Sequence, residues 1–192
     1  MKDTPKFFVT IPVKPYVRRF LELNYGTPVN FTGDIVTYKF LRDLLKKPNM
    51  RFHTKYPENN CTYSTEVEVV ISEDDFYRYG FELTKPDIVT FGKHFEDRAK
   101  VMMRSMVGVY NGIGLPIRDS IWKFQTRFGF EEETWNFDSI KKDFYRNGIN
   151  GKIDFNNEIF AKIEKIILVN LSVLGTVSQR VIRQYESSNE AG

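Results

Sequence analysis

Residue types that commonly perform catalysis are sparse in this chain, and their spacing matches no catalytic motif. The two histidines, His53 and His94, have no carboxylate or cysteine at metal-ligand spacing nearby. Cys61 is the only cysteine, which excludes an intrachain disulfide and a cysteine-based metal cluster. No Gly-x-Ser-x-Gly segment follows a predicted strand, so a serine nucleophile is not indicated. The sequence therefore predicts a protein that is not an enzyme and that needs no cofactor or metal.

Basic residues occur in blocks, although the formal net charge of the 192-residue chain is only +3. Residues 1–57 hold eleven Lys and Arg against four Asp and Glu, residues 58–97 hold three against ten, and residues 98–127 hold six against one. Charges separated in this way form surface patches of both signs. A polyanionic partner is therefore compatible with the small net charge.

The segment of residues 117–147 is the strongest candidate for a binding function, because its layout is that of a helix-turn-helix. Two short amphipathic segments, IRDSIWKFQTRFG and FDSIKKDFYRNG, flank a turn that contains Gly129. Ile140 and Phe144 are expected to face the core. The opposite side of the second helix then carries four residues suited to DNA: Lys141, Lys142, Tyr145 and Arg146. Cations on the preceding helices are expected to meet phosphates: Arg98, Lys100, Arg104, Arg118, Lys123 and Arg127.

Ordinary solvent-exposed faces of a helical bundle would give the same pattern. The acidic run Glu131–Glu133 would repel a DNA backbone lying alongside it. The connection between the two helices is also longer than the usual turn of about three or four residues. The sequence leaves both interpretations open.

A second candidate for nucleic-acid contact is the segment of residues 46–56, KKPNMRFHTKY. Its basic residues alternate with aromatic ones, as expected for phosphate contacts combined with base stacking. The residues expected to make contact are Lys47, Arg51 and Phe52. A solvated loop whose rings fold back onto the protein explains the composition equally well.

Two segments, FFVTIPVKPYVRRFLELNYG and IWKFQTRFGFEEETWNFDSIKKDFYR, resemble uncharacterised proteins of phages and mobile elements of gut and related bacteria. The second resembles the helix-turn-helix that such elements use in regulation or replication. The resemblance covers about half of the chain and implies a DNA-binding role by analogy. It also fits a structural or assembly protein of a phage, because phages make small helical adaptors of this size.

Hydrophobic periodicity predicts the elements that position these candidates. Apolar residues alternate over residues 6–13 and 63–71, which predicts two antiparallel strands. Three short helices are expected as well: residues 16–25, residues 34–47 ending at Pro48, and a helix from the Ser72 cap to Gly80. A long helix is expected from Thr84 to Gly112.

The last apolar run, residues 156–185, predicts one terminal helix. Its charged residues exclude a membrane span. Its apolar residues are too many for one face, which predicts self-association. The single cysteine and the short segment before the first strand indicate a cytoplasmic protein.

We therefore expect an α+β, mostly helical protein. A lobe over residues 1–83 holds a small two-stranded antiparallel sheet with helices, and an all-α lobe over residues 84–192 holds the helix-turn-helix. The expected function is non-catalytic binding of double-stranded DNA, regulatory or replication-associated, by an oligomer, with no membrane or small-molecule partner. The alternative is a structural or assembly protein in which the same helices pack against neighbouring subunits.

Overall fold

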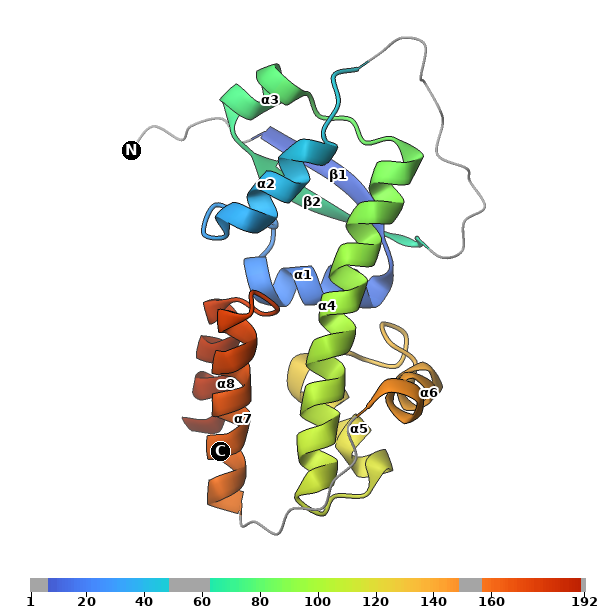
Figure 1. Ribbon diagram of the computed structural model, residues 1–192, viewed down its shortest axis with the longest axis vertical. Coiled ribbons are helices and arrows are strands. Elements are labelled where there is room, and N and C mark those ends of the chain that lie inside the picture. The colour runs from blue at the N-terminus through green and yellow to red at the C-terminus, as the bar shows by residue number, and fades with distance from the viewer. Residues whose placement is uncertain (1–6, 49–62, 149–156, 191–192) are drawn as a thin grey trace. The chain divides into compact units, whose positions relative to one another are not determined.

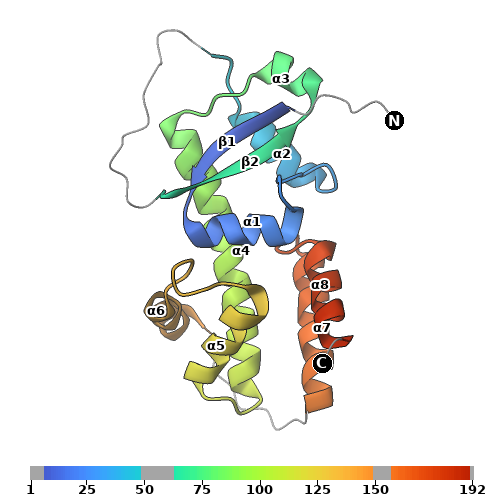
Figure 2. The same cartoon turned by 180° about the vertical axis from the view of Figure 1, so that it is seen from behind.

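The structure, a computed structural model of the chain, describes residues 7–48, 63–148 and 157–190, except for the side chains of residues 157–161 and 188–190. These residues form two strands and eight helices (Figures 1 and 2). The α+β, mostly helical fold expected from the sequence is confirmed. The chain divides into two units between Phe95 and Glu96, inside the long helix α4 (Lys85–Gly112), whereas the expected boundary at residues 83/84 precedes that helix.

The first unit is built on an antiparallel pair of strands, β1 (Phe7–Val13) and β2 (Thr65–Ile71). Three alternate residues of each strand are apolar and buried, so one face of the sheet packs against helices: Val9, Ile11, Val13, Val67, Val69 and Ile71. Ile11 lies opposite Val67 on this face. The two strands and their antiparallel pairing are confirmed as predicted.

Three short helices and the start of α4 complete this unit: α1 (Pro15–Tyr25), α2 (Ile35–Leu44) and α3 (Glu73–Tyr79). Figures 1 and 2 show α2 and the start of α4 against one face of the sheet. The prediction that α2 continues to residue 47 is wrong. It ends at Leu44, because the backbone of Leu45 is extended and Lys46 exchanges two backbone hydrogen bonds with Glu82.

The second unit contains the rest of α4 and four further helices: α5 (Ile117–Phe128), α6 (Phe137–Asn147), α7 (Asn157–Val173) and α8 (Gln179–Glu190). Helices α5 and α6 are the two helices of the predicted helix-turn-helix. In Figure 1, α6 is seen almost end-on while the adjacent part of α4 runs vertically, so α6 crosses this part of α4 steeply.

The prediction of a single terminal helix over residues 156–185 is wrong. The chain reverses at Gly175, whose φ of 67° is a left-handed conformation that glycine adopts at little cost. The amide of Thr176 donates to the carbonyl of Leu171 at 2.7 Å, which closes the turn. Helices α7 and α8 therefore form a hairpin and lie side by side in both views (Figures 1 and 2). Leu168 and Leu171 of α7 and Val181 and Ile182 of α8 are buried, so the hairpin covers part of the apolar surface that is too large for one face of a single helix.

Candidate nucleic-acid interface

The connection between α5 and α6 is a folded turn. Helix α5 ends at Gly129, which has φ 66° and ψ 37°, the left-handed conformation common after helices. The chain then turns back, and the rings of Phe130 and Trp135 lie 5.1 and 6.1 Å from that of Phe124. All three rings are buried. These aromatic contacts fix α6 on α5, although the connection is longer than in a compact helix-turn-helix.

Glu132, within this turn, supports the start of α6, whose N-cap residue is Asn136. Its carboxylate accepts the backbone N–H of Phe137 at 3.0 Å and the side-chain amide of Asn136 at 2.6 Å. A negative charge there is favourable because the helix dipole is positive at its N-terminus. One of the three glutamates that argue against DNA binding in the sequence therefore has a structural role. All three glutamates are exposed.

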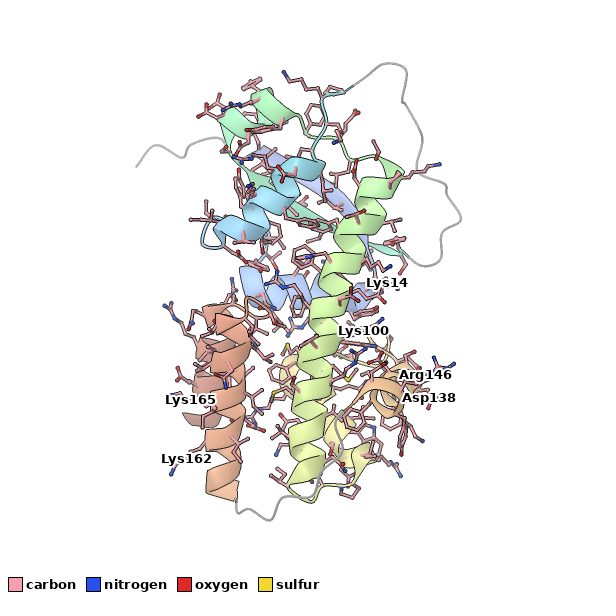
Figure 3. All side chains as sticks on the ribbon, in the orientation of Figure 1. Lys14, Lys100, Asp138, Arg146, Lys162 and Lys165 are labelled. Carbon is pink, nitrogen blue, oxygen red and sulfur yellow. The ribbon has the colours of Figure 1, made fainter. Side chains whose placement is uncertain are left out.

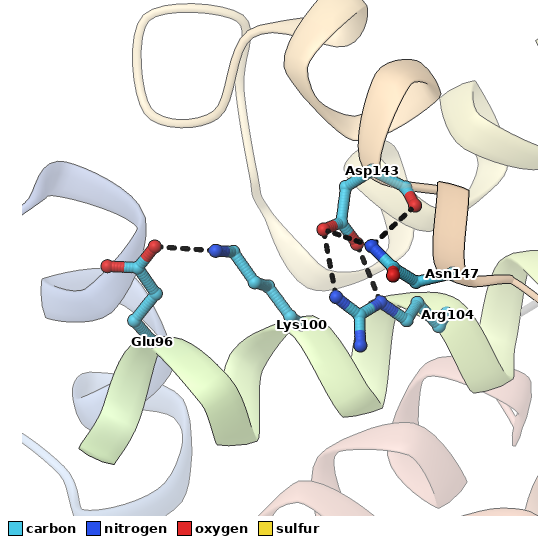
Figure 4. A network of polar contacts seen from close by, with 5 residues as sticks. All are labelled: Glu96, Lys100, Arg104, Asp143 and Asn147. Carbon is cyan, nitrogen blue, oxygen red and sulfur yellow. Dashed lines mark hydrogen bonds and ion pairs between the residues drawn. The ribbon is translucent and has the colours of Figure 1, made fainter. Parts of the chain in front are cut away.

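An ion pair holds α6 on α4. Arg104 donates from Nε and Nη2 to the two carboxylate oxygens of Asp143, at 2.6 and 2.8 Å (Figure 4). Partial burial favours the neutral form of Asp143, but the bonds and charge of Arg104, the charge of Lys100 and a bond from Asn147 outweigh it. The pKa of Asp143 is therefore below its ordinary value.

Two other cations of α4, Arg98 and Lys100, were also expected to meet phosphates. Lys100 donates to Glu96 at 2.6 Å, and Arg98 is half-buried. Arg98, Lys100 and Arg104 are thus all partly buried, and they do not form an exposed basic surface.

The opposite side of α6 is solvent-exposed. Ile140 and Phe144 are fully buried, which confirms the predicted division of this helix into two faces. The exposed residues are Lys141, Lys142, Tyr145 and Arg146. In the described parts of the chain, none of the three cations forms an ion pair. Figure 3 shows Arg146 on the outer side of α6.

Helix α5 adds Arg118 and Trp122 to this surface. Arg118 was expected from the sequence, whereas Trp122 was not. The guanidinium of Arg118 lies 4.1 Å from the centre of the Trp122 ring. The same ring is 6.3 Å from that of Phe137, so the exposed side of α5 adjoins the start of α6. The signal that could have found Trp122 is its spacing of one helical turn from Arg118, on the polar side of α5. We call the exposed residues Arg118, Trp122, Lys141, Lys142, Tyr145 and Arg146 the α5–α6 face.

Lys123 and Arg127, also expected to contact DNA, instead make contacts inside the second unit. Arg127 Nη2 lies 3.4 Å from a carboxylate oxygen of Glu164, and its guanidinium lies 4.4 Å from the Tyr185 ring centre. Glu164 is 2% exposed and also accepts a hydrogen bond from the hydroxyl of Tyr185. The Lys123 ammonium lies 5.3 Å from the ring centre of Tyr110. The contacts of Arg127 attach the α7–α8 hairpin to α5, and the contact of Lys123 joins α5 to α4.

Tyr110 in this cluster is fully buried. Burial, followed by the nearby carboxylate of Glu164, raises the pKa of Tyr110 far above its ordinary value. Its hydroxyl therefore stays protonated at any physiological pH.

The second candidate segment is described only at its start. Lys47 is exposed, whereas Arg51 and Phe52 lie outside the described residues. Of the two histidines, His94 packs against Phe40, with ring centres 4.4 Å apart, and His53 lies outside the described residues.

Within residues 7–48, 63–148 and 157–190, no three His, Cys, Asp or Glu side chains are grouped so that they could hold a metal ion. None of the described helices is long and apolar enough to cross a membrane. Comparison of the chain with models of protein families, with curated proteins and with solved structures found no match.

Proposed function

We propose that the protein is a non-catalytic DNA-binding protein and that it binds DNA through the α5–α6 face. The observation that carries this proposal is the group of four exposed cations on that face, Arg118, Lys141, Lys142 and Arg146. None of them has an acidic partner within the described residues. Cations without internal partners are available to phosphates, and release of counterions from DNA then favours binding.

The way in which α6 is mounted supports this role. The Arg104–Asp143 pair and the buried side chains of Ile140 and Phe144 hold the inner side of α6. Glu132 accepts the first backbone N–H at the start of this helix. The outer side remains open to a ligand. Lys142 and Arg146 lie one turn apart on this side, a spacing that lets two side chains of one helix contact a nucleic-acid backbone together.

The test is the double variant Lys142→Ala/Arg146→Ala, measured with a labelled DNA duplex at several salt concentrations. Each lost phosphate contact should reduce the slope of log affinity against log salt by about 0.9, so the slope should fall by about two units. Lys39→Ala/Lys93→Ala is the matched control, because it removes two exposed cations from the first unit. Equal affinity and slope for the two variants would refute DNA binding by the α5–α6 face.

A second candidate function, assembly through self-association, is favoured by the surface of α7. Its Ile166, Val169 and Val173 are 58, 39 and 80% exposed, and Leu174 at the turn is 76% exposed. Water-exposed apolar residues at spacings of three and four along a helix are typical of a face that packs against another protein. We propose a second copy of the chain as the partner.

Light scattering tests this candidate directly. Val173→Asp should convert an oligomer into a folded monomer, because Val173 is exposed within one chain. Leu171→Asp is the contrasting variant. Leu171 is 5% exposed, so an unpaired charge there should unfold the hairpin itself rather than release a folded monomer. A wild-type protein that stays monomeric at the highest concentration measured would end the self-association proposal.

A further inference from the structure

Two aromatic side chains lie exposed among the cations of the α5–α6 face. Trp122 is 47% exposed and Tyr145 is 57% exposed. Exposure of a single large ring is common on protein surfaces. Two such rings between unpaired cations form a different pattern, which is typical of proteins that bind unpaired nucleotides.

The rings and cations form one continuous band across the two helices. Arg118 lies over the Trp122 ring, and that ring adjoins Phe137 at the start of α6. Phe137, Lys141 and Tyr145 follow one another at four-residue steps, so they share one side of α6. Aromatic and positive groups therefore alternate along the band from α5 to the end of α6.

Each ring offers a surface on which a base can stack. Within the described residues the Tyr145 ring has no ring or cation against it, so it is open to a flat ligand. The Trp122 ring is covered by the planar guanidinium of Arg118 at 4.1 Å. A base can stack on the outer side of that guanidinium, because arginine planes held on an aromatic ring accept bases as aromatic rings do.

We propose that the α5–α6 face binds preferentially DNA with unpaired bases, which stack on Tyr145 and on the Trp122–Arg118 pair while Lys141, Lys142 and Arg146 contact the phosphates. This inference rests on the proposed DNA-binding function and names the form of DNA that the face recognises. In a paired duplex the faces of the bases are covered by their neighbours, and only base edges reach a protein in the grooves. Large exposed rings find no stacking partner there.

Fluorescence anisotropy with three labelled probes tests the proposal: a single strand, the same sequence as a perfect duplex, and that duplex with an internal stretch of unpaired bases. We expect the single strand and the interrupted duplex to bind about tenfold more tightly than the perfect duplex, on the scale of one base stacked on an aromatic ring. Tyr145→Leu and Trp122→Leu should each weaken binding of the single strand and the interrupted duplex more than binding of the perfect duplex, so the preference should shrink. Lys142→Ala/Arg146→Ala should weaken binding of all three probes.

Intrinsic tryptophan fluorescence gives a second measurement of stacking, one that does not depend on a variant with weakened binding. The chain has two tryptophans, the exposed Trp122 and Trp135, which is 4% exposed. Unpaired DNA should quench the emission of the wild type, and Trp122→Phe should abolish the quenching, because the remaining tryptophan is enclosed.

The outcomes separate this inference from the proposed function. If all three probes bind equally, and neither leucine variant nor Trp122 emission responds, the stacking proposal is overturned. DNA binding by the cations still stands in that case, provided that the double alanine variant weakens it. If no probe binds the wild type, both proposals are overturned.

Discussion

The C-terminal end of α5 and the outer side of α6 carry similar cations in opposite surroundings. Arg127 on α5 lies beside the buried carboxylate of Glu164 and over the ring of Tyr185. Arg146 on α6 is exposed and has no ion pair within the described residues. The first arginine attaches the α7–α8 hairpin to α5, whereas the second makes no such attachment.

This difference shows which positive charges are available for function. When one member of a buried ion pair is removed or moves away, the other charge stays buried without a counter-charge, which destabilises the protein. Such a cation therefore serves the fold. An exposed charge contributes little to folding, because water and salt screen it. A ligand can therefore bind the exposed charge without first breaking a contact inside the protein.

The largest effect that this comparison predicts is on stability. Arg127→Ala should lower the free energy of unfolding by about 3–5 kcal/mol, because the Glu164 carboxylate loses the cation beside it. Arg146→Ala should change it by less than about 0.5 kcal/mol, as expected for an exposed residue. Urea denaturation of the two variants measures both values.

The double variant Arg127→Met/Glu164→Leu serves as the control, since it removes both charges and keeps apolar volume. It should be more stable than Arg127→Ala, because no buried charge is left alone. Equal destabilisation by Arg127→Ala and Arg146→Ala would show that the two regions do not differ in the way described.

A smaller effect is expected from Asp143, which anchors α6 on its inner side. Asp143→Asn should lower the free energy of unfolding near neutral pH by about 1.5–3 kcal/mol, the range for a hydrogen bond to a charged group. The effect should depend on pH, because the pKa of Asp143 is lower in the folded protein than its ordinary value of 3.8. The folded state then binds fewer protons than the unfolded state between the two pKa values.

The contribution of Asp143 is therefore complete above about pH 4 and is lost as the pH falls through the folded pKa. The difference in stability between the wild type and Asp143→Asn should shrink when denaturation is repeated at decreasing pH. Asp138→Asn on the exposed side of α6 is the matched control, and its effect should remain small at every pH. A difference for Asp143→Asn that stays constant below about pH 3 would contradict the role of the ion pair.

Local patterns in the sequence predicted the two faces of α6, both strands and the starts of most helices, because periodicity and caps act within a few residues. They could not predict the partner of Arg127, because Glu164 lies on α7, far from α5 along the chain. The reversal at Gly175 was missed for a related reason. Apolar residues continue on both sides of the turn, with Leu171 before it and Val177 after it, and both are buried as they would be in a continuous helix.

The smallest effect concerns Glu132, whose neighbours in the acidic run provide an internal comparison. Glu132→Ala should destabilise the protein by about 1 kcal/mol, because the N–H of Phe137 and the amide of Asn136 lose their acceptor at the start of α6.

Glu133→Ala should have almost no effect on stability, since Glu133 is exposed and accepts no hydrogen bond within the described residues. It should instead strengthen DNA binding slightly, because it removes a negative charge in the turn that leads into α6. Thermal denaturation and DNA titration of both variants measure these effects, and equal stability loss for the two would mean that Glu132 is no more than another surface charge.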